Sequence, residues 1–247
     1  MKTEKITSVI EFLNLVQNFE NQDIAQWFFR GHGDSSFTLV PGLYRLNVSD
    51  TFSNWKDIEK YMMDSFKREA LPYLKITPKS EEEWLTLAQH HGLPTRLLDW
   101  TESPLIALYF AVENYMNSKN ANVWCFGVAS TNNCKPQSTF IARRINTEIS
   151  TCILLPNHIS PRVTNQLGCF TIHDLPEDRK PFVPFDNQKS SHNSFRRILI
   201  KKQHKIKILN ELYFLGIHKG LVYPGIDGIT QKIKYEVTTE HSRNSKF

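Results

Sequence analysis

Polar side chains that could bind an anion or carry out chemistry are concentrated between residues 89 and 104. The segment reads Gln89-His90-His91-Gly92-Leu93-Pro94-Thr95-Arg96-Leu97-Leu98-Asp99-Trp100-Thr101-Glu102-Ser103-Pro104. Asp99, Thr101 and Ser103 directly precede an apolar stretch that is typical of a helix. Free backbone N–H groups and the helix dipole at such a position favour an anion or the polar part of a ligand. The same residue types commonly cap helices, so closing the turn is the alternative role.

Two helices and a strand are expected to position these side chains. Ser80 followed by Glu83 is a capping box, which predicts a helix that ends at Gly92 and Pro94. Residues 95–99 suit a short strand whose far end turns sharply. Ser103 is expected to cap the second helix, whose buried face is predicted to contain Leu105, Leu108, Tyr109, Val112 and Met116.

A second group of polar residues follows an aromatic strand. Residues 25–31 include Trp27-Phe28-Phe29 and are expected to form a strand that is covered on both faces. Arg30 at its end is either an ion-paired edge residue or an anion clamp. Gly31 permits a close approach of the backbone. Residues 37–45 contain Tyr44 and form a loop that could fold over a ligand.

The remaining pattern predicts an α+β fold with a mainly antiparallel or mixed sheet and flanking helices. Helices are expected at residues 8–20, 54–71 and 203–215, and strands at 123–129, within 161–173, at 195–202 and, with a turn, at 221–228. The Met and aromatic stripe of the 54–71 helix is expected to be core. Residues 130–142 are expected to be a mobile loop, 176–193 a surface excursion and 231–247 a polar tail that frays, while 146–155 are ambiguous.

Composition favours a folded protein of one domain spanning residues 1–247. The chain has 247 residues, 40% of them hydrophobic, and lacks an apolar run near the roughly 20 residues of a membrane helix. Its start does not resemble a signal peptide, so a cytoplasmic location is expected. The net charge of +5 favours nucleic acid as a partner, although a merely soluble basic surface explains it equally well.

Common cofactor and metal motifs are absent from the sequence. There is no G-x-G-x-x-G, no P-loop and no H-E-x-x-H. Adjacent His90 and His91 would point apart on a helix, which makes a shared metal site poor. The four cysteines, of which none forms a C-x-x-C pair, are expected to be reduced thiols.

Several segments together resemble the FRG domain family, over about residues 20–230. These segments are Phe29-Arg30-Gly31, Pro41-Gly42-Leu43-Tyr44-Arg45, residues 89–111, Arg162 with Asn165-Gln166-Leu167-Gly168-Cys169-Phe170, and residues 221–228. The order of the motifs is similar to that in NAD-dependent ADP-ribosyltransferases. This resemblance implies a split sheet in which NAD is held as co-substrate without a metal.

The resemblance also implies roles for individual residues. Arg30 would bind the NAD phosphate or ribose, and Thr101 with Ser103 would brace the arginine and the ribose. Gln166 stands where those enzymes have a glutamate, but an amide cannot neutralise the positive charge that develops on the ribose. Asp99 is the nearest carboxylate that could substitute, and Glu102 and Glu211 are weaker candidates. The expected cofactor-binding residues are Arg30, Gly31, Tyr44, His91, Arg96, Thr101, Ser103 and Phe170.

The function implied by the resemblance is that of a bacterial ADP-ribosyltransferase toxin. Its setting would be phage defence or a toxin-antitoxin system, with an antitoxin as a partner. The acceptor would be nucleic acid, RNA in particular, or protein. The excess of basic over acidic residues favours nucleic acid. Two alternatives are a non-catalytic module that binds a nucleotide or a partner, and a glycohydrolase that passes the ADP-ribose of NAD to water.

Overall fold

The computed structural model describes residues 3–19, 24–129, 141–144, 152–155, 164–176, 178–188 and 195–239. Eight strands within these segments form one sheet in the order β1-β8-β4-β2-β3-β7-β6-β5. They are β1 (Thr3–Ile6), β2 (Ile24–His32), β3 (Leu97–Thr101), β4 (Ala121–Ala129), β5 (Ile141–Arg144), β6 (Cys152–Leu155), β7 (Gly168–Ile172) and β8 (Phe195–Ile200). β1 and β8 are parallel, and the other neighbours are antiparallel. The predicted α+β fold with a mixed, mainly antiparallel sheet and flanking helices is confirmed.

The junction between β2 and β3 is the weakest point of the sheet. These two strands share the single residue pair Phe29 and Thr101, whereas β2 pairs with β4 along most of its length. The sheet is therefore two sets of strands, β1-β8-β4-β2 and β3-β7-β6-β5, joined at one point. Arg30 and Asp99 lie next to that junction, one on each set.

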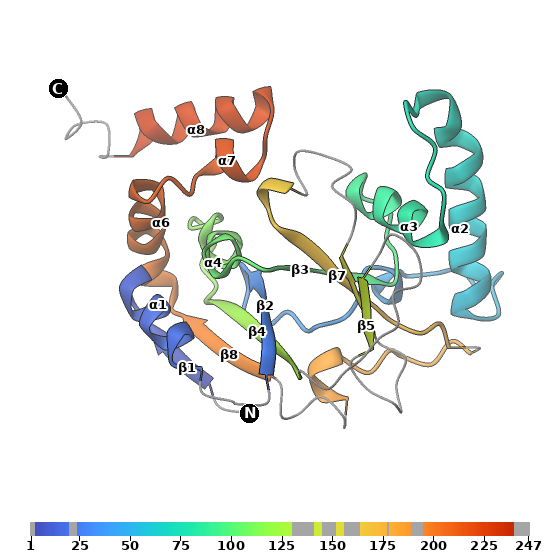
Figure 1. The fold of residues 1–247 in the computed structure, drawn as a ribbon, viewed down its shortest axis with the longest axis horizontal. Helices are drawn as coiled ribbons and strands as arrows, with labels where there is room; N and C mark the ends of the chain where they lie inside the picture. The colour runs from blue at the N-terminus through green and yellow to red at the C-terminus, as the bar shows by residue number, and fades with distance from the viewer. Residues whose placement is uncertain are drawn as a thin grey trace.

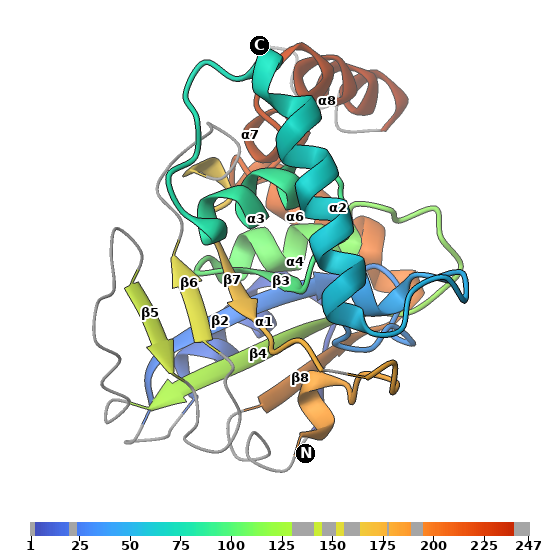
Figure 2. The same cartoon turned by 90° about the vertical axis from the view of Figure 1, so that its right-hand side faces the viewer.

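Different helices cover the two sets of strands (Figures 1 and 2). α1 (Val9–Gln17), α4 (Pro104–Val112) and α6 (Lys205–Phe214) share a hydrophobic core with β2, β4 and β8. α2 (Trp55–Ala70) and α3 (Glu81–His90) share another with β3, β6 and β7. α7 (Lys219–Val222) and α8 (Ile226–Thr238) lie beside each other beyond α6. Short 3-10 turns are η1 (Leu43–Arg45), η2 (Leu71–Tyr73), η3 (Phe185–Asn187) and η5 (Lys202–His204).

The helix starts follow the capping residues in the sequence. Ser8, Asn54, Ser80 and Ser103 each accept a hydrogen bond from the backbone N–H three residues further on. This satisfies a donor that would otherwise lack an intrahelical partner. The predicted helices at residues 8–20, 54–71, 203–215 and after Ser80 and Ser103 are thereby confirmed, with shifted ends.

The region after residue 220 differs from its prediction. The expected strand and turn at 221–228 are instead α7 and the start of α8, and α8 also includes residues 231–238 of the expected fraying tail. The apolar run Leu221-Val222-Tyr223 suits a strand by composition, but it is too short to indicate periodicity. Gly225, with φ of 128°, makes the tight connection between the two helices.

Several smaller expectations are also corrected. β3 begins at Leu97 rather than at residue 95, and α4 ends at Val112, so Met116 is exposed rather than buried. On α2, Tyr61 is exposed although its stripe was expected to be core. Phe185 is buried although it lies in the expected surface excursion.

Other predictions fall partly or wholly outside the described residues. Residues 130–140 of the expected mobile loop, 146–151 of the ambiguous segment and Arg162 lie outside them. Cys125 and Cys169 are free and buried, as expected for reduced thiols. Across the described ranges, the structure contains no helix with the length and apolar character needed to cross a bilayer.

Candidate active site at the split of the sheet

A pocket of about 400 Å³ opens at the junction between β2 and β3. Its volume is within the range of small-molecule sites. Aromatic rings provide much of the wall, and charged groups come from both sets of strands and from α4. The lining residues are Phe29, Arg30, Gly31, Gln89, His90, Asp99, Trp100, Thr101, Phe110, Glu113, Gln166, Gly168, Cys169 and Phe170.

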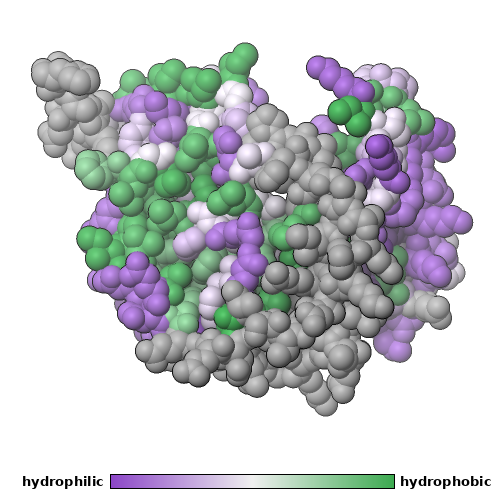
Figure 3. Space-filling view, viewed as in Figure 1, coloured by the Kyte–Doolittle hydropathy of each residue, from purple (hydrophilic) through white to green (hydrophobic). Residues whose placement is uncertain are grey.

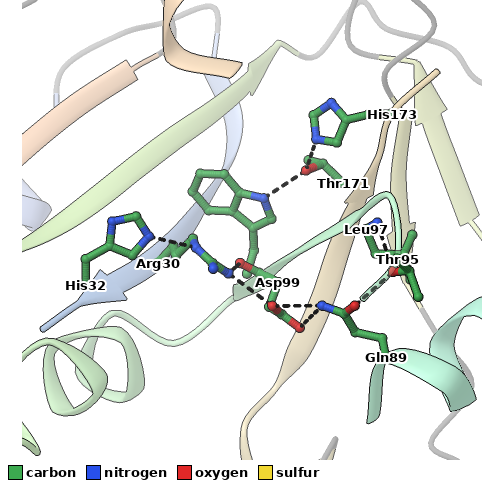
Figure 4. A network of polar contacts seen from close by, with 9 residues as sticks. Arg30, His32, Gln89, Thr95, Leu97, Asp99, Thr171 and His173 are labelled. Carbon is green, nitrogen blue, oxygen red and sulfur yellow. Dashed lines mark hydrogen bonds and ion pairs between the residues drawn. The ribbon is translucent and has the colours of Figure 1, made fainter. Parts of the chain in front are cut away.

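Arg30 joins the two sides of the pocket (Figure 4). Its Nη1 donates to the backbone oxygen of Asp99 at 2.6 Å and lies 3.2 Å from the Asp99 carboxylate Oδ2. Its Nε donates to His32 Nε2 at 3.0 Å. The Arg30 side chain is 19% exposed and that of Asp99 is 53% exposed. The guanidinium is therefore held from two directions and still reaches the pocket.

A chain of hydrogen bonds holds the Asp99 carboxylate from the other side. Gln89 Nε2 donates to both oxygens of Asp99 at 3.1 Å. Thr95 Oγ1 donates to Gln89 Oε1 at 2.8 Å and accepts from the backbone N–H of Leu97. α3 and the loop before β3 thus fix the orientation of a carboxylate on β3.

His32 must be neutral to act as the support of Arg30. Because the Arg30 Nε carries a hydrogen, His32 Nε2 has to accept, and the imidazole proton lies on Nδ1. Burial, helped by the positive charge of Arg30, lowers the pKa of His32 to about 3. The ring is therefore uncharged at neutral pH, and no second cation opposes Arg30.

A second neutral histidine supports the pocket wall from behind. Trp100 Nε1 donates to Thr171 Oγ1 at 3.1 Å, and that hydroxyl lies 2.9 Å from His173 Nε2. Burial lowers the pKa of His173 to about 3. A buried polar group is costly unless it is hydrogen-bonded, so this chain lets an indole and an imidazole pack within the core.

The hydroxyls of the turn after β3 are used within the protein. Thr101 Oγ1 donates to the backbone oxygen of Gln166 at 2.6 Å and accepts from the N–H of Ser103 at 3.0 Å. Ser103 Oγ accepts from the N–H of Ile106 as the N-cap of α4. Thr101 still lines the pocket, but Ser103 does not. The two hydroxyls therefore brace the turn, which was the alternative interpretation of this pattern.

Gln166 lies in the pocket wall just before β7. Its Nε2 donates to the backbone oxygen of Val222 at 3.0 Å, and the adjacent Asn165 Nδ2 donates to that of Leu221. Leu167, with φ of 45°, is the non-glycine residue with positive φ among the described residues. A strained backbone of this kind is often found next to a ligand site. Gln166 is thus fixed by α7 rather than positioned by β7 itself.

Gly31 has a packing role next to Arg30. A Cβ at this position would lie 1.9 Å from the backbone oxygen of Ala107 and 2.6 Å from the N of Ala111. β2 therefore packs directly on the backbone of α4, consistent with the close approach expected at Gly31.

Glu113 is a charged pocket residue that sequence reasoning missed. Its carboxylate accepts from Lys219 Nζ at 2.8 Å and from the Tyr223 hydroxyl at 3.0 and 3.1 Å. Its partners lie more than 100 residues away in the chain, so no local pattern marks the site. Gln89 was within the conspicuous segment, and His32 follows the Phe29-Arg30-Gly31 motif two residues after Arg30, but neither was singled out.

Four of the expected site residues lie outside the pocket lining. Tyr44 is buried against Trp55 and Phe182, and its hydroxyl donates to the backbone oxygen of Asp174. Arg96 lies 3.4 Å from the buried carboxylate of Glu59. The other two are His91, which lines a groove beside α2, and Ser103.

The two weaker carboxylate candidates also lie elsewhere. Glu102 accepts a hydrogen bond from Gln26 and is not among the lining residues. Glu211 accepts from the backbone N–H of Val9 at 2.7 Å and so caps α1. The pocket therefore brings together Arg30, Gly31, Asp99, Thr101, Gln166 and Phe170 of the predicted set.

The arrangement suits a ligand that has an anionic part and a flat part. Arg30 provides a fixed cation, Phe29, Phe110 and Phe170 provide apolar walls, and Asp99 and Glu113 provide carboxylates. Carboxylates could orient sugar hydroxyls or stabilise a positive charge that develops during bond cleavage. Over the part of the chain that the structure describes, no group of three or more His, Cys, Asp or Glu side chains could hold a metal ion.

Comparison with protein families found a match to part of the chain. Residues 25–120 match the model of the FRG domain. The matched segment runs from β2 past the end of α4 and contains Arg30, Gln89, Asp99 and Glu113, whereas Gln166 and Phe170 lie beyond it. Neither the comparison with curated proteins nor that with solved structures found a match.

Proposed function

We propose that this chain, whose residues 25–120 match the FRG domain, binds NAD at the split of the sheet and transfers its ADP-ribose. The observation that carries the proposal is the convergence of Arg30, Asp99 and Glu113 in one aromatic-walled pocket. NAD combines a pyrophosphate, two ribose groups and two flat rings. Each of these has a chemically matched group in the wall.

The arginine would hold the pyrophosphate. Arg30 Nε and Nη1 are engaged with His32 and Asp99, while Nη2 makes none of the hydrogen bonds found among the described residues. A guanidinium fixed in this way loses little further rotamer freedom on binding a phosphate. The pocket would therefore be organised before NAD arrives.

A carboxylate would stabilise the reacting ribose. Cleavage of the bond between nicotinamide and ribose builds positive charge on the sugar, and a preorganised negative group lowers that barrier. Asp99 lines the pocket, is held by Gln89 and Arg30, and has a half-exposed side chain. Glu113 is the second carboxylate in reach of the cavity. The acceptor that takes the ADP-ribose is proposed to be RNA or another nucleic acid, or a protein.

A labelling experiment tests this function. Purified protein is incubated with NAD labelled in the adenylate, together with RNA, DNA or protein pools, and both label transfer and free nicotinamide are measured. We expect transfer to one pool and loss of it in Arg30→Ala. Arg68→Ala is the matched control, since Arg68 is an exposed arginine that pairs with its neighbour Glu69 on α2. Full transfer by Arg30→Ala would contradict the proposal.

One observation favours a second function, binding without transfer. The amide of Gln166 takes the place expected for a glutamate, and it is engaged with the backbone of Val222. A neutral amide can orient a hydroxyl but cannot offset positive charge. NAD binding with neither transfer nor nicotinamide release would support this module, and nicotinamide release without transfer would indicate a glycohydrolase. The biological setting that goes with transfer, a toxin in phage defence or with an antitoxin, is part of the same proposal.

A further inference from the structure

The outer face of α8 is an exposed apolar stripe. Its side chains recur at spacings of three and four residues, which places them on one side of the helix. They are Ile226 at 83%, Ile229 at 53%, Ile233 at 52% and Val237 at 71% exposure. Figure 3 shows hydrophobic residues on the surface of the molecule over α8. A row of branched aliphatic side chains in water is typical of an interaction surface.

The opposite face of α8 is the one that attaches it to the body of the protein. A Cβ on Gly228 would lie 1.8 Å from the backbone oxygen of Tyr223, so the helix packs tightly on the segment after α7. The Tyr235 ring contacts Tyr213 in a tilted arrangement and Tyr115 edge to face. α8 is therefore firmly seated through Gly228 and Tyr235, and its isoleucines point away from the molecule.

The charges beside the stripe are arranged for a second copy of the same helix. Asp227 and Lys234 lie seven residues apart on one flank of the stripe, both exposed. Neither forms an ion pair with another described residue. In an antiparallel pair related by a two-fold axis, Asp227 of each copy faces Lys234 of the other, and Ile229 faces Ile233. In a parallel pair this flank of the two copies would lie on opposite sides of the interface, so Asp227 and Lys234 would not face each other.

We propose that α8 joins two copies of this chain through an antiparallel helix pair. A single alignment of the two helices makes the apolar contacts and the charged contacts together. It also places Ile226 near Val237 of the second copy. A helix of 13 residues is only about 20 Å long, so the contact is small and the dimer is expected to be weak and dependent on concentration. The interface lies apart from the residues that line the NAD pocket, so it does not rest on the proposed function.

Sedimentation velocity of the full chain, over about 5 to about 500 µM, tests the dimer. Ile233→Asp is expected to abolish it, whereas Ile76→Asp, at an isoleucine that is 82% exposed elsewhere, should not change it. Asp227→Lys alone and Lys234→Asp alone are each expected to raise the dissociation constant about threefold to tenfold, because like charges then face each other twice. The double variant should restore dimerisation.

Two controls keep the outcome interpretable. Circular dichroism of each variant shows whether α8 still folds, and the reversed pair Lys60→Asp with Asp64→Lys on exposed positions of α2 shows whether charge reversal has a general effect. A monomer at every concentration would overturn the proposal and leave the stripe to a different protein. A dimer that tolerates Ile233→Asp, or single reversals that the double variant does not rescue, would also overturn it.

Discussion

At the scale of single residues, the site depends on how Arg30 is held. The sequence left two roles open for this arginine, an ion pair or an anion clamp, and the structure shows that the ion pair with Asp99 leaves part of the guanidinium facing the pocket. Local pattern indicated Arg30, Asp99 and Thr101 because they lie in conspicuous motifs. It could not find Glu113, whose partners come from a distant helix, or the neutral state of His32, which depends on burial.

The buried histidines predict how stability depends on pH. The folded pKa of His173 is about 3, below the ordinary value of 6.5, so between these values the unfolded chain binds a proton that the folded chain does not. The contribution of His173 to the free energy of unfolding is therefore fully present above pH 6.5 and is lost as the pH falls toward 3. We expect this histidine to account for about 2 kcal/mol of the loss between pH 7 and pH 5, and His32, lowered in the same way, for a similar amount.

Urea unfolding at pH 7 and pH 5 measures this effect. His173→Gln removes the titrating group. Between pH 7 and pH 5, the free energy of unfolding of this variant should therefore fall by about 2 kcal/mol less than that of the unsubstituted protein. Other titrating groups contribute equally to both proteins and cancel in the comparison. One of them is Glu59, whose pKa is raised by burial, so its contribution to stability changes with pH in the opposite direction. An identical pH dependence in both proteins would show that His173 does not carry the effect.

At the scale of elements, α4 and its turn determine where β2 and β3 meet. Capping residues and helical periodicity predicted α4, and Gly31 was expected to permit a close approach of the backbone. The structure shows that the element packed against Gly31 is the backbone of α4. The region after residue 220 could not be predicted, because its short apolar run fits a strand or a helix equally well until the tertiary packing of α7 and α8 decides between them.

Gly31→Ala is expected to destabilise the fold by about 3 kcal/mol or more, because β2 and α4 would have to move apart to accept a methyl group. Gly33→Ala is the matched control on the same segment, since a Cβ there would lie 4.0 Å from its nearest backbone neighbour. Denaturant unfolding of both variants measures the difference. Equal stability of the two would contradict the packing described for β2.

Ser103→Ala tests whether the turn hydroxyl is a cap or a ligand group. The Ser103 side chain caps α4 and does not line the pocket, so its loss should lower the free energy of unfolding by about 1 kcal/mol. NAD affinity, measured by titration, should remain within about twofold. A large loss of affinity with unchanged stability would instead place Ser103 in contact with the ligand.

At the scale of the whole molecule, the sheet is two sets of strands whose backbones pair at a single position, Phe29 with Thr101. The class of fold followed from the sequence, because the strands and helices have clear periodicity and caps. The division of the sheet did not follow from any local signal, since strand order depends on contacts between distant segments. A ligand in the pocket would touch both sets of strands and so strengthen their junction.

Hydrogen exchange is expected to show that strengthening. Saturating NAD should slow amide exchange in residues 29–32 of β2 and 97–101 of β3, because a ligand that binds the folded state lowers the population of open states. Exchange in α8, which does not line the pocket, should change little. Protection confined to α8, or spread evenly over the chain, would argue against binding at the junction.

Isothermal titration calorimetry with NAD tests the central claim most directly, because it requires neither the acceptor nor turnover. We expect the original protein and Arg68→Ala to bind NAD with equal affinity, and Arg30→Ala to bind at least about tenfold more weakly, as the loss of a charge-assisted contact to phosphate implies. Equal binding by all three proteins, or no binding by any of them, would contradict the assignment of this pocket to NAD.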